Sequence, residues 1–221
     1  MKTIVYLIRH SEPFKTHRGI KNTKENILIE NQKSPLSING ERMAELLSHH
    51  IELKNIDEVW SSNYVRAMST AKYFAHKNNT KVNIDDRLDE RIHGVDSWDE
   101  LPNDFEEKQI TDENYKIGYG ENQKEVQNRM FSILEELLEK NKMKSMIMVS
   151  HSTAMLFLLK KWCDIQNNGI ITFNDKVIFK GKWHYLETFK LEFDENKKLI
   201  SISNLIINNE EDNEVEKNGI I

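Results

Sequence analysis

The sequence predicts an α/β fold: a single three-layer domain in which a mostly parallel sheet carries helices on both faces. Apolar runs typical of buried parallel strands occur at residues 4–8 and 146–150. Segments with strand and helix periodicity also alternate along the chain, as in sheets built from β–α–β units. The length of 221 residues suits one such domain, although length alone would also permit two.

In the first half of the chain, the strand at residues 4–8 is followed by a polar loop over residues 11–34. Ser37 has the side chain of a helix N-cap, and we expect a helix from there through residue 51. A short strand at residues 57–61 then precedes a helix over residues 63–77, and an extended segment lies near residues 82–84.

In the second half, residues 122–125 resemble a capping box, with asparagine in place of serine, and start a helix that runs to about residue 140. The strand at residues 146–150 leads into an apolar helix over residues 153–162. We expect the last strands at residues 176–179, 185–193 and 199–207, with a turn at residues 194–197 between the final two.

Arg9 and His10 follow the first predicted strand. In open α/β sheets, ligands bind at this carboxyl end of the strands. The planar fork of an arginine suits phosphate oxygens, and a neutral histidine can attack phosphorus. We therefore hypothesise phosphoryl transfer, with the alternative that both residues only close a strand with polar side chains.

Two further residues bear on this hypothesis. Arg66 lies in the first turn of the helix expected at residues 63–77, where the helix dipole favours anions. His151 follows the strand at residues 146–150, just as His10 follows the first strand. Taken singly, each is compatible with an ordinary surface arginine or a structural histidine. Together they favour an anion site.

Six motifs occur in order from the amino terminus to about residue 152. They are RHSE at residues 9–12, PLSING at 35–40, SSNYVRAMSTA at 61–71, LDE at 88–90 with Gly94, GEN at 120–122 with Arg129, and VSH at 149–151. In this combination the chain resembles the histidine phosphatase family, also called the phosphoglycerate mutase-like superfamily, and the resemblance covers most of the chain. Its hallmark R-H-G-[EQ] differs here only at Ser11.

The resemblance implies the phosphoglycerate mutase-like fold and a role for each site residue. His10 would be the nucleophile that forms a phosphohistidine, while Arg9, Arg66 and His151 would bind the phosphoryl group. Glu90 would protonate the leaving alkoxide and then activate water, whereas taken alone it would be a solvated loop carboxylate. The scheme requires neither a metal nor another cofactor.

Three further residues, Ser11, Thr16 and Ser152, are expected to lie next to the phosphate site. The family usually has glycine where this chain has Ser11 and Ser152, so these side chains should border the phosphate and add hydroxyl donors. Thr16 lies where family members often place a phosphate-contacting residue. The loop around it is basic, with Lys15, His17, Arg18, Lys21 and Lys24, and would either hold a second anionic group or be solvated. Residues 93–119, rich in aromatic side chains, would form a lid or pack against the sheet.

Composition limits the partners. The formal net charge is −5 and the isoelectric point about 5.9, which argues against a nucleic-acid or membrane surface. The family resemblance implies a small phosphorylated metabolite as the partner. The histidines outside the motifs are not at metal-ligand spacings, and no glycine-rich nucleotide loop occurs. Cys163 is the only cysteine, and no signal peptide or membrane span is evident, so we expect a cytoplasmic protein of open oligomeric state.

We expect residues 1–208 to form the catalytic domain and the acidic residues 209–221 to be a disordered tail. A phosphatase is the preferred function, because the segment between Glu90 and His151 is short and residues 13–14 are not the W-N pair of the superfamily's mutases. A phosphoglycerate mutase-type phosphotransferase is the alternative. A non-catalytic protein that binds phosphorylated ligands is a third reading.

Overall fold

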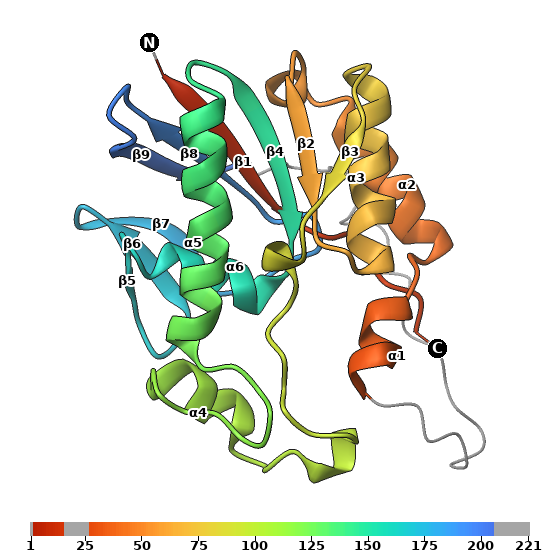
Figure 1. Ribbon diagram of the computed structural model, residues 1–221, viewed down its shortest axis with the longest axis vertical. Helices are drawn as coiled ribbons and strands as arrows, with labels where there is room; N and C mark the ends of the chain where they lie inside the picture. Colours follow the sequence, from red (N-terminus) through yellow and green to blue (C-terminus); the bar gives the residue numbers. More distant parts are fainter. Residues whose placement is uncertain (1, 16–26, 206–221) are drawn as a thin grey trace.

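A six-stranded sheet forms the centre of the structure, a computed structural model that describes residues 2–15 and 27–205 (Figure 1). The strand order is β3-β2-β4-β1-β8-β9. The strands are β1 (Thr3–Arg9), β2 (Glu58–Ser61), β3 (Val82–Ile84), β4 (Ser145–Ser150), β8 (Thr188–Phe193) and β9 (Leu199–Asn204). The first four in this order are parallel to one another, whereas β8 and β9 join as antiparallel strands at one side. The sheet is therefore mixed and mostly parallel, as predicted.

Strands β1 and β4 are the two central strands, and their register determines where the polar residues that follow them lie. Each strand alternates buried apolar side chains between the two faces, as Val5 and Tyr6 do in β1. Arg9 pairs with Ser150, so both strands end at the same level. The backbone N–H of His10 then donates to the carbonyl of Ser150 at 2.9 Å. This register brings His10 beside His151, although the two lie far apart in the sequence.

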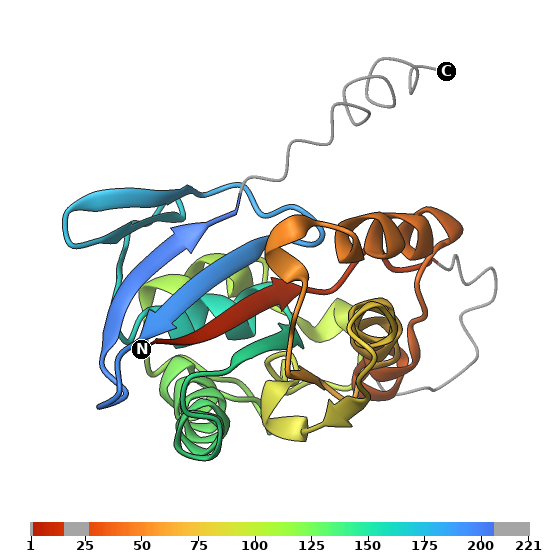
Figure 2. The same cartoon turned by 90° about the horizontal axis from the view of Figure 1, so that it is seen from above.

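Helices cover both faces of the sheet, which confirms the predicted three layers (Figure 2). On one face, α2 (Ile38–Ser48) and α3 (Val65–Lys77) pack on one hydrophobic core, and on the other α5 (Gln123–Lys140) and α6 (Ser152–Leu159) pack on a second. The expected caps are present, with Ser37 accepting from the backbone N–H of Gly40. Asn122 and Glu125 form the capping box of α5.

Several elements differ from the sequence prediction. The segment predicted as a polar loop contains α1 (Ile27–Lys33), and the segment before α5 contains α4 (Phe105–Thr111). After α6, a separate three-stranded antiparallel sheet is formed by β5 (Asp164–Ile165), β6 (Ile170–Phe173) and β7 (Lys176–Lys180). Strand β7 confirms the strand predicted at residues 176–179, whereas β5 and β6 were not predicted. Short 3-10 helices lie at Ile51–Leu53, Asp86–Leu88 and Trp98–Glu100. These elements are too short to give a clear hydrophobic period.

Several predicted boundaries were also wrong. The helix expected through residue 51 ends at Ser48, and the strand expected through residue 207 ends at Asn204. The strand expected to start at residue 185 begins at Thr188, because Leu186 adopts a φ of 62°, which no strand accommodates. The apolar helix that follows His151 ends at Leu159, before the predicted residue 162. The acidic tail at residues 209–221 and Thr16 lie outside the described residues, so the domain limits stay a prediction. Within residues 2–15 and 27–205, every helix is too short or too polar to cross a membrane.

Candidate active site

His10 lies directly after β1 and is only 5% exposed. Its Nδ1 is 2.7 Å from the carbonyl oxygen of Ser11, which can only accept, so Nδ1 carries the ring proton. The other nitrogen, Nε2, therefore has a free lone pair, and it accepts a hydrogen bond from Nε of Arg66 at 3.0 Å. Burial, and then the charge of Arg66, lower the pKa of His10 well below its ordinary value. The ring is thus neutral and suited to attack an electrophile through Nε2.

Arg66 lies in the first turn of α3, as predicted, and points into the same space as His10. Its side chain is 5% exposed, and its guanidinium carbon lies 4.9 Å from the ring centre of Tyr64. Nη2 donates to Nδ1 of His151 at 3.1 Å, and Nη1 donates to the carbonyl oxygen of Asn31 in α1. Burial lowers the pKa of Arg66, but arginine remains charged near neutral pH. All three nitrogens of the fork therefore point toward other site residues or toward α1.

His151 continues this arrangement on its far side. Because Nδ1 accepts from Arg66, Nε2 carries the ring proton and donates to Oγ of Ser62 at 2.9 Å. The Ser62 hydroxyl in turn donates to Oδ1 of Asp89 at 2.7 Å. Ser62 and Asp89 lie within the sequence motifs at residues 61–71 and 88–90, but no role was predicted for either residue. No local signal predicts that two residues so far apart in the chain meet behind a histidine.

Arg9 approaches the site from the end of β1. Its Nε is buried and has no hydrogen-bond partner within the described part of the chain, while Nη1 is 3.4 Å from the carbonyl oxygen of Trp183. Burial lowers the pKa of its guanidinium, which lies 4.9 Å from the ring centre of Tyr185. A buried charged donor without a partner is costly, which indicates that an anion belongs beside it. Tyr185 was not predicted as a site residue, because its position was predicted to be the start of a strand.

Glu90 lies at the amino terminus of α6, next to His151. Its Oε1 accepts from the backbone N–H groups of Ala154 at 3.0 Å and of Arg91 at 2.9 Å. Arg129 of α5 holds this backbone, since it donates to the carbonyl oxygens of Asp89 at 2.8 Å and Glu90 at 3.1 Å. The negative charge of Glu90 partly opposes the lowering of the pKa of Arg66 and Arg9 by burial.

The two predicted serines are placed differently from each other. Ser11 is fully buried, and its hydroxyl donates to the carbonyl oxygen of Gly40 at 2.7 Å, so its proton is directed at α2. Gly40 permits this close approach, because a Cβ there would overlap the backbone oxygen of Glu12. Ser152 opens α6 directly after His151. Phosphate binding by either hydroxyl stays a prediction, and Thr16 lies outside the described residues.

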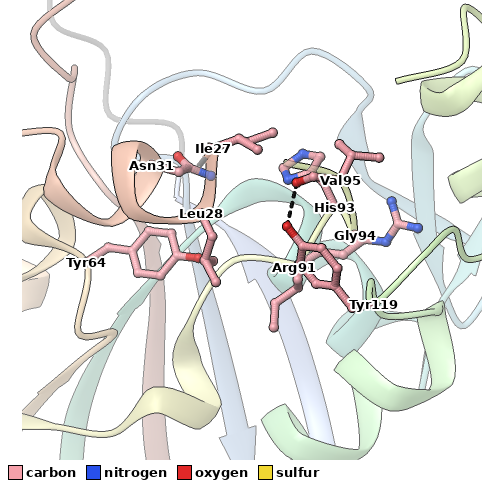
Figure 3. Close-up of a pocket in the computed structure, with 10 residues that line it drawn as sticks. Ile27, Leu28, Asn31, Tyr64, Arg91, His93, Gly94, Val95 and Tyr119 are labelled. Carbon is pink, nitrogen blue, oxygen red and sulfur yellow. Dashed lines mark hydrogen bonds between the residues drawn. The ribbon is translucent and has the colours of Figure 1, made fainter. Parts of the chain in front are cut away.

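A pocket of about 210 Å³, open to solvent, adjoins Arg66 (Figure 3). Tyr64 and Asn31 lie on one side of it, and His93 and Tyr119 on the other. Tyr119 closes one wall by donating its hydroxyl to the carbonyl oxygen of Val95 at 2.6 Å. The other residues that line the pocket are Ile27, Leu28, Arg91, Ile92 and Gly94. Burial lowers the pKa of His93 to about 4, so its imidazole ring is neutral at pH 7.

Arg91 and the aromatic side chains of residues 93–119 form a small cluster below this pocket. Arg91 is almost fully buried and donates to Oε1 of Gln109 at 2.7 Å. Phe105 is 2% exposed and lies against His93 and Tyr115, with ring centres 5.6 Å and 5.9 Å away. Trp98 and Tyr119, in contrast, are 47% and 51% exposed. The segment thus has its own packed centre, and motion as a lid stays a prediction.

Within the part of the chain that the structure describes, no group of three histidine, cysteine or acidic side chains is placed to hold a metal ion. Cys163 is buried and unpaired, and burial raises the pKa of its thiol to about 12. The arrangement that remains is a neutral histidine, the buried Arg66, the half-buried Arg9, a second histidine and a carboxylate around one space. Such a set can bind a phosphoryl group and transfer it.

Among proteins of known name, the chain is similar to phosphatases and to mutases. It is 30% identical to phosphoserine phosphatase 1 of Hydrogenobacter thermophilus over 129 residues, which is 54% of this chain and 60% of that enzyme. It is also 30% identical to the probable phosphoglycerate mutase GpmB of Yersinia enterocolitica over 163 residues, or 70% of this chain and 72% of that protein.

Solved structures show the same fold. A mutant phosphoserine phosphatase from Entamoeba histolytica in complex with phosphoserine matches with a TM-score of 0.63 at 18% identity, covering 91% of this chain and 96% of that one. A mycobacterial glucosyl-3-phosphoglycerate phosphatase in complex with inorganic phosphate matches with a TM-score of 0.66 at 14% identity, covering 92% and 95%. The sequence profile described as the histidine phosphatase superfamily (branch 1) matches residues 5–197. The chain therefore belongs to branch 1 of the histidine phosphatase superfamily.

Proposed function

We propose that this protein is a phosphatase that hydrolyses small phosphate monoesters through a phosphohistidine on His10, without a metal. One observation carries the proposal: three groups suited to a phosphoryl group converge. They are the unprotonated Nε2 of His10, the fork of Arg66 that donates to it, and the buried Nε of Arg9, which has no partner within the described residues. Fixed positive charge is what attack on an anionic ester requires, and the two arginines supply it.

In the first half-reaction, Arg9 and Arg66 bind the phosphoryl oxygens. Nε2 of His10 attacks phosphorus as the bond to the alcohol oxygen breaks, and that oxygen takes the electron pair and a proton from the Glu90 carboxyl. In the second half-reaction, the Glu90 carboxylate takes a proton from water while the water oxygen attacks phosphorus. His10 leaves as the neutral ring, and inorganic phosphate is released.

The alcohol part of the ester would lie in the pocket beside Arg66. Tyr64 lines this pocket and also contacts His151, with ring centres 4.8 Å apart, so the pocket and the phosphoryl site share a wall. The pocket is small and open to solvent, which supports a small monoester as the substrate class.

A phosphoglycerate mutase-type phosphotransferase is the second candidate, and the similarity to GpmB of Yersinia enterocolitica favours it. A mutase must return the phosphoryl group to its bound product and exclude water. The open pocket and the short segment between Glu90 and His151 favour hydrolysis instead. A protein that binds phosphorylated ligands without turnover is the third candidate.

The test is a screen of phosphate release over sugar phosphates, nucleotides and phosphoglycerates with EDTA present. The phosphatase proposal expects release from at least one monoester, with no requirement for added metal. Incubation with 3-phosphoglycerate, with and without 2,3-bisphosphoglycerate, measures isomerisation in parallel. Isomerisation much faster than release would favour the mutase. Binding of phosphate without any turnover would favour the third candidate.

A further inference from the structure

Four side chains form a row of hydrogen bonds that leads from the phosphoryl site into the protein. Arg66 donates to His151, His151 donates to Ser62, and Ser62 donates to Asp89. The direction of each hydrogen bond in this row is determined, because an arginine can only donate hydrogen bonds. Nδ1 of His151 therefore accepts and carries no proton. The proposed mechanism uses only Arg66 from this row, and His151 is expected to bind the phosphoryl group, so the role of Ser62 and Asp89 is open.

Asp89 is a half-buried carboxylate with defined partners. Its Oδ1 accepts from the Ser62 hydroxyl at 2.7 Å and from the backbone N–H of Asn63 at 3.0 Å. Burial raises the pKa of Asp89 to about 6, and the negative charge of Asp86 in the preceding 3-10 helix adds to this rise. The two hydrogen bonds and the positive charge of Arg129 in α5 act in the opposite direction. The group is thus mostly ionised at pH 7 and becomes protonated just below.

His151 is fully buried among charged and titratable groups from several elements. Arg66 and Tyr64 face it from α3 and its N-cap, Arg9 and His10 from the end of β1, Arg129 from α5, and Glu90 from the loop that approaches α6. Burial first, and then these positive charges, lower its pKa well below the ordinary value. The free ring is consequently neutral.

This neutral ring presents a difficulty when a phosphoryl group binds. A phosphoryl group bound by Arg66 would compete for the Nη2 N–H group that Nδ1 of His151 now accepts. A lone pair on Nδ1 would face an anion, which is repulsive. Nε2 of His151 cannot donate to the phosphoryl group instead, because its proton is donated to Oγ of Ser62. His151 can bind the anion favourably only if Nδ1 gains a proton.

We propose that Asp89, acting through the Ser62 hydroxyl, is a positioning residue that enables His151 to become a cationic N–H donor to the bound phosphoryl group. The proton comes from the monoanionic ester: its P–O–H bond breaks, an N–H bond forms at Nδ1, and the electron pair stays on the phosphoryl oxygen. The Nε2 proton remains on the ring, directed at Ser62. The Asp89 carboxylate balances the new charge, two hydrogen bonds away.

The first test reads the His151 ring directly by ¹⁵N NMR of histidine-labelled protein titrated with inorganic phosphate at pH 6–8. We expect both ring nitrogens of His151 to be protonated in the phosphate-bound wild type. In Asp89→Asn, and equally in Ser62→Ala, Nδ1 should stay unprotonated and phosphate should bind more weakly. Asp86→Asn, an exposed neighbour of the same charge, should behave as wild type.

The second test is a double-variant cycle on kcat/KM. Asp89→Asn and Ser62→Ala should each lower kcat/KM by about 10- to 100-fold, as when the carboxylate behind a histidine ligand is removed. Each should also shift the pH profile. Because both substitutions interrupt one row, the double variant should be no worse than either single variant. A purely structural role for Asp89 would leave the pH profile unmoved and the effects additive.

The outcomes separate this inference from the proposed function on which it rests. A His151 ring that remains singly protonated in phosphate-bound wild type overturns the inference, as does unchanged His151 protonation in both variants. Circular dichroism identifies any variant that does not fold, and the other variant then decides. Phosphate binding with a doubly protonated His151 but no turnover contradicts the phosphatase proposal alone. Failure of the wild type to bind phosphate contradicts both.

Discussion

Nε of Arg66 donates to Nε2 of His10 at 3.0 Å, so the residue that is proposed to bind the phosphoryl oxygens also holds the proposed attacking nitrogen. The lone pair of Nε2 is therefore held by Arg66 and must be released from this hydrogen bond before it can attack phosphorus. Because Nδ1 is bound to the carbonyl oxygen of Ser11, the ring has no second orientation that preserves both bonds. Binding of the anion and release of the nucleophile are therefore expected to occur together.

The guanidinium fork of Arg66 should matter more than its charge. Arg66→Lys keeps the charge but loses Nε and the paired donors that reach His10 and His151. We expect kcat/KM to fall by on the order of 10²-fold or more, by analogy with the loss of a transition-state donor. Inhibition by vanadate should weaken in parallel. Arg87→Lys, which alters a surface ion pair with Asp85, serves as the control and should retain activity.

Glu90 should matter most for substrates with poor leaving groups. Glu90→Gln keeps the size of the side chain but removes the proton that the alkoxide needs. We expect a large loss of kcat/KM for alkyl phosphates and a much smaller loss for p-nitrophenyl phosphate. The measurement is kcat/KM over a series of esters with graded leaving-group pKa. An equal loss across the series would mean that Glu90 is not the acid.

Arg129 should act on activity through the backbone that it holds. It donates to the carbonyl oxygens of Asp89 and Glu90 and pairs with Glu121 at 2.7 Å. Arg129→Gln leaves Glu121 without its partner, so we expect a lower melting temperature together with a reduced kcat. If kcat at a temperature where the variant is fully folded equals that of wild type, Arg129 has only a stabilising role.

The stability of the fold should depend on pH through His93. Burial lowers its pKa to about 4 in the folded state, against about 6.5 in the unfolded chain, so the unfolded state binds more protons between these values. Stability is then lost as the pH falls below about 6.5. His93→Gln should remove on the order of 1 kcal/mol of this loss between pH 7 and pH 5, allowing for partial exposure of the ring.

Urea unfolding at the two pH values measures this effect, with the exposed His76→Gln as the matched control. His10 and His151, whose pKa values are also lowered, contribute in the same direction in every variant. Asp89 has a raised pKa of about 6 and opposes them, because its ionisation costs stability as the pH rises. An equal pH dependence in His93→Gln and wild type would contradict the assignment to His93.

The sequence predicts best those parts of the fold whose signals are local. The apolar runs of β1 and β4, the Ser37 cap and the Asn122 capping box each lie within a few residues, and all are confirmed. Short elements such as α1 bury too few side chains to produce a period, and only Ile27 of α1 is buried. The small sheet of β5 to β7 was missed in part for the same reason.

In the candidate site too, the residues that follow from local signals could be predicted, whereas contacts between distant parts of the chain could not. His10, Arg66 and His151 could be brought together from the sequence, because strand ends and helix starts meet at one edge of a parallel sheet. The Ser62–Asp89 contact joins the chain just after β2 to the chain just after β3, and no short pattern encodes this approach. Tyr185 lies beside Arg9 only because Leu186 takes up a left-handed backbone conformation while its side chain is buried.

The central claim is that His10 becomes phosphorylated during turnover. Rapid acid-free quenching in denaturant of the enzyme with a ³²P-labelled monoester, followed by peptide mapping, measures this directly. We expect a base-stable, acid-labile phosphoryl group on Nε2 of His10, absent from His10→Ala, which should fold normally and release no phosphate. Near wild-type turnover in His10→Ala, or a label on any other residue, would contradict the account.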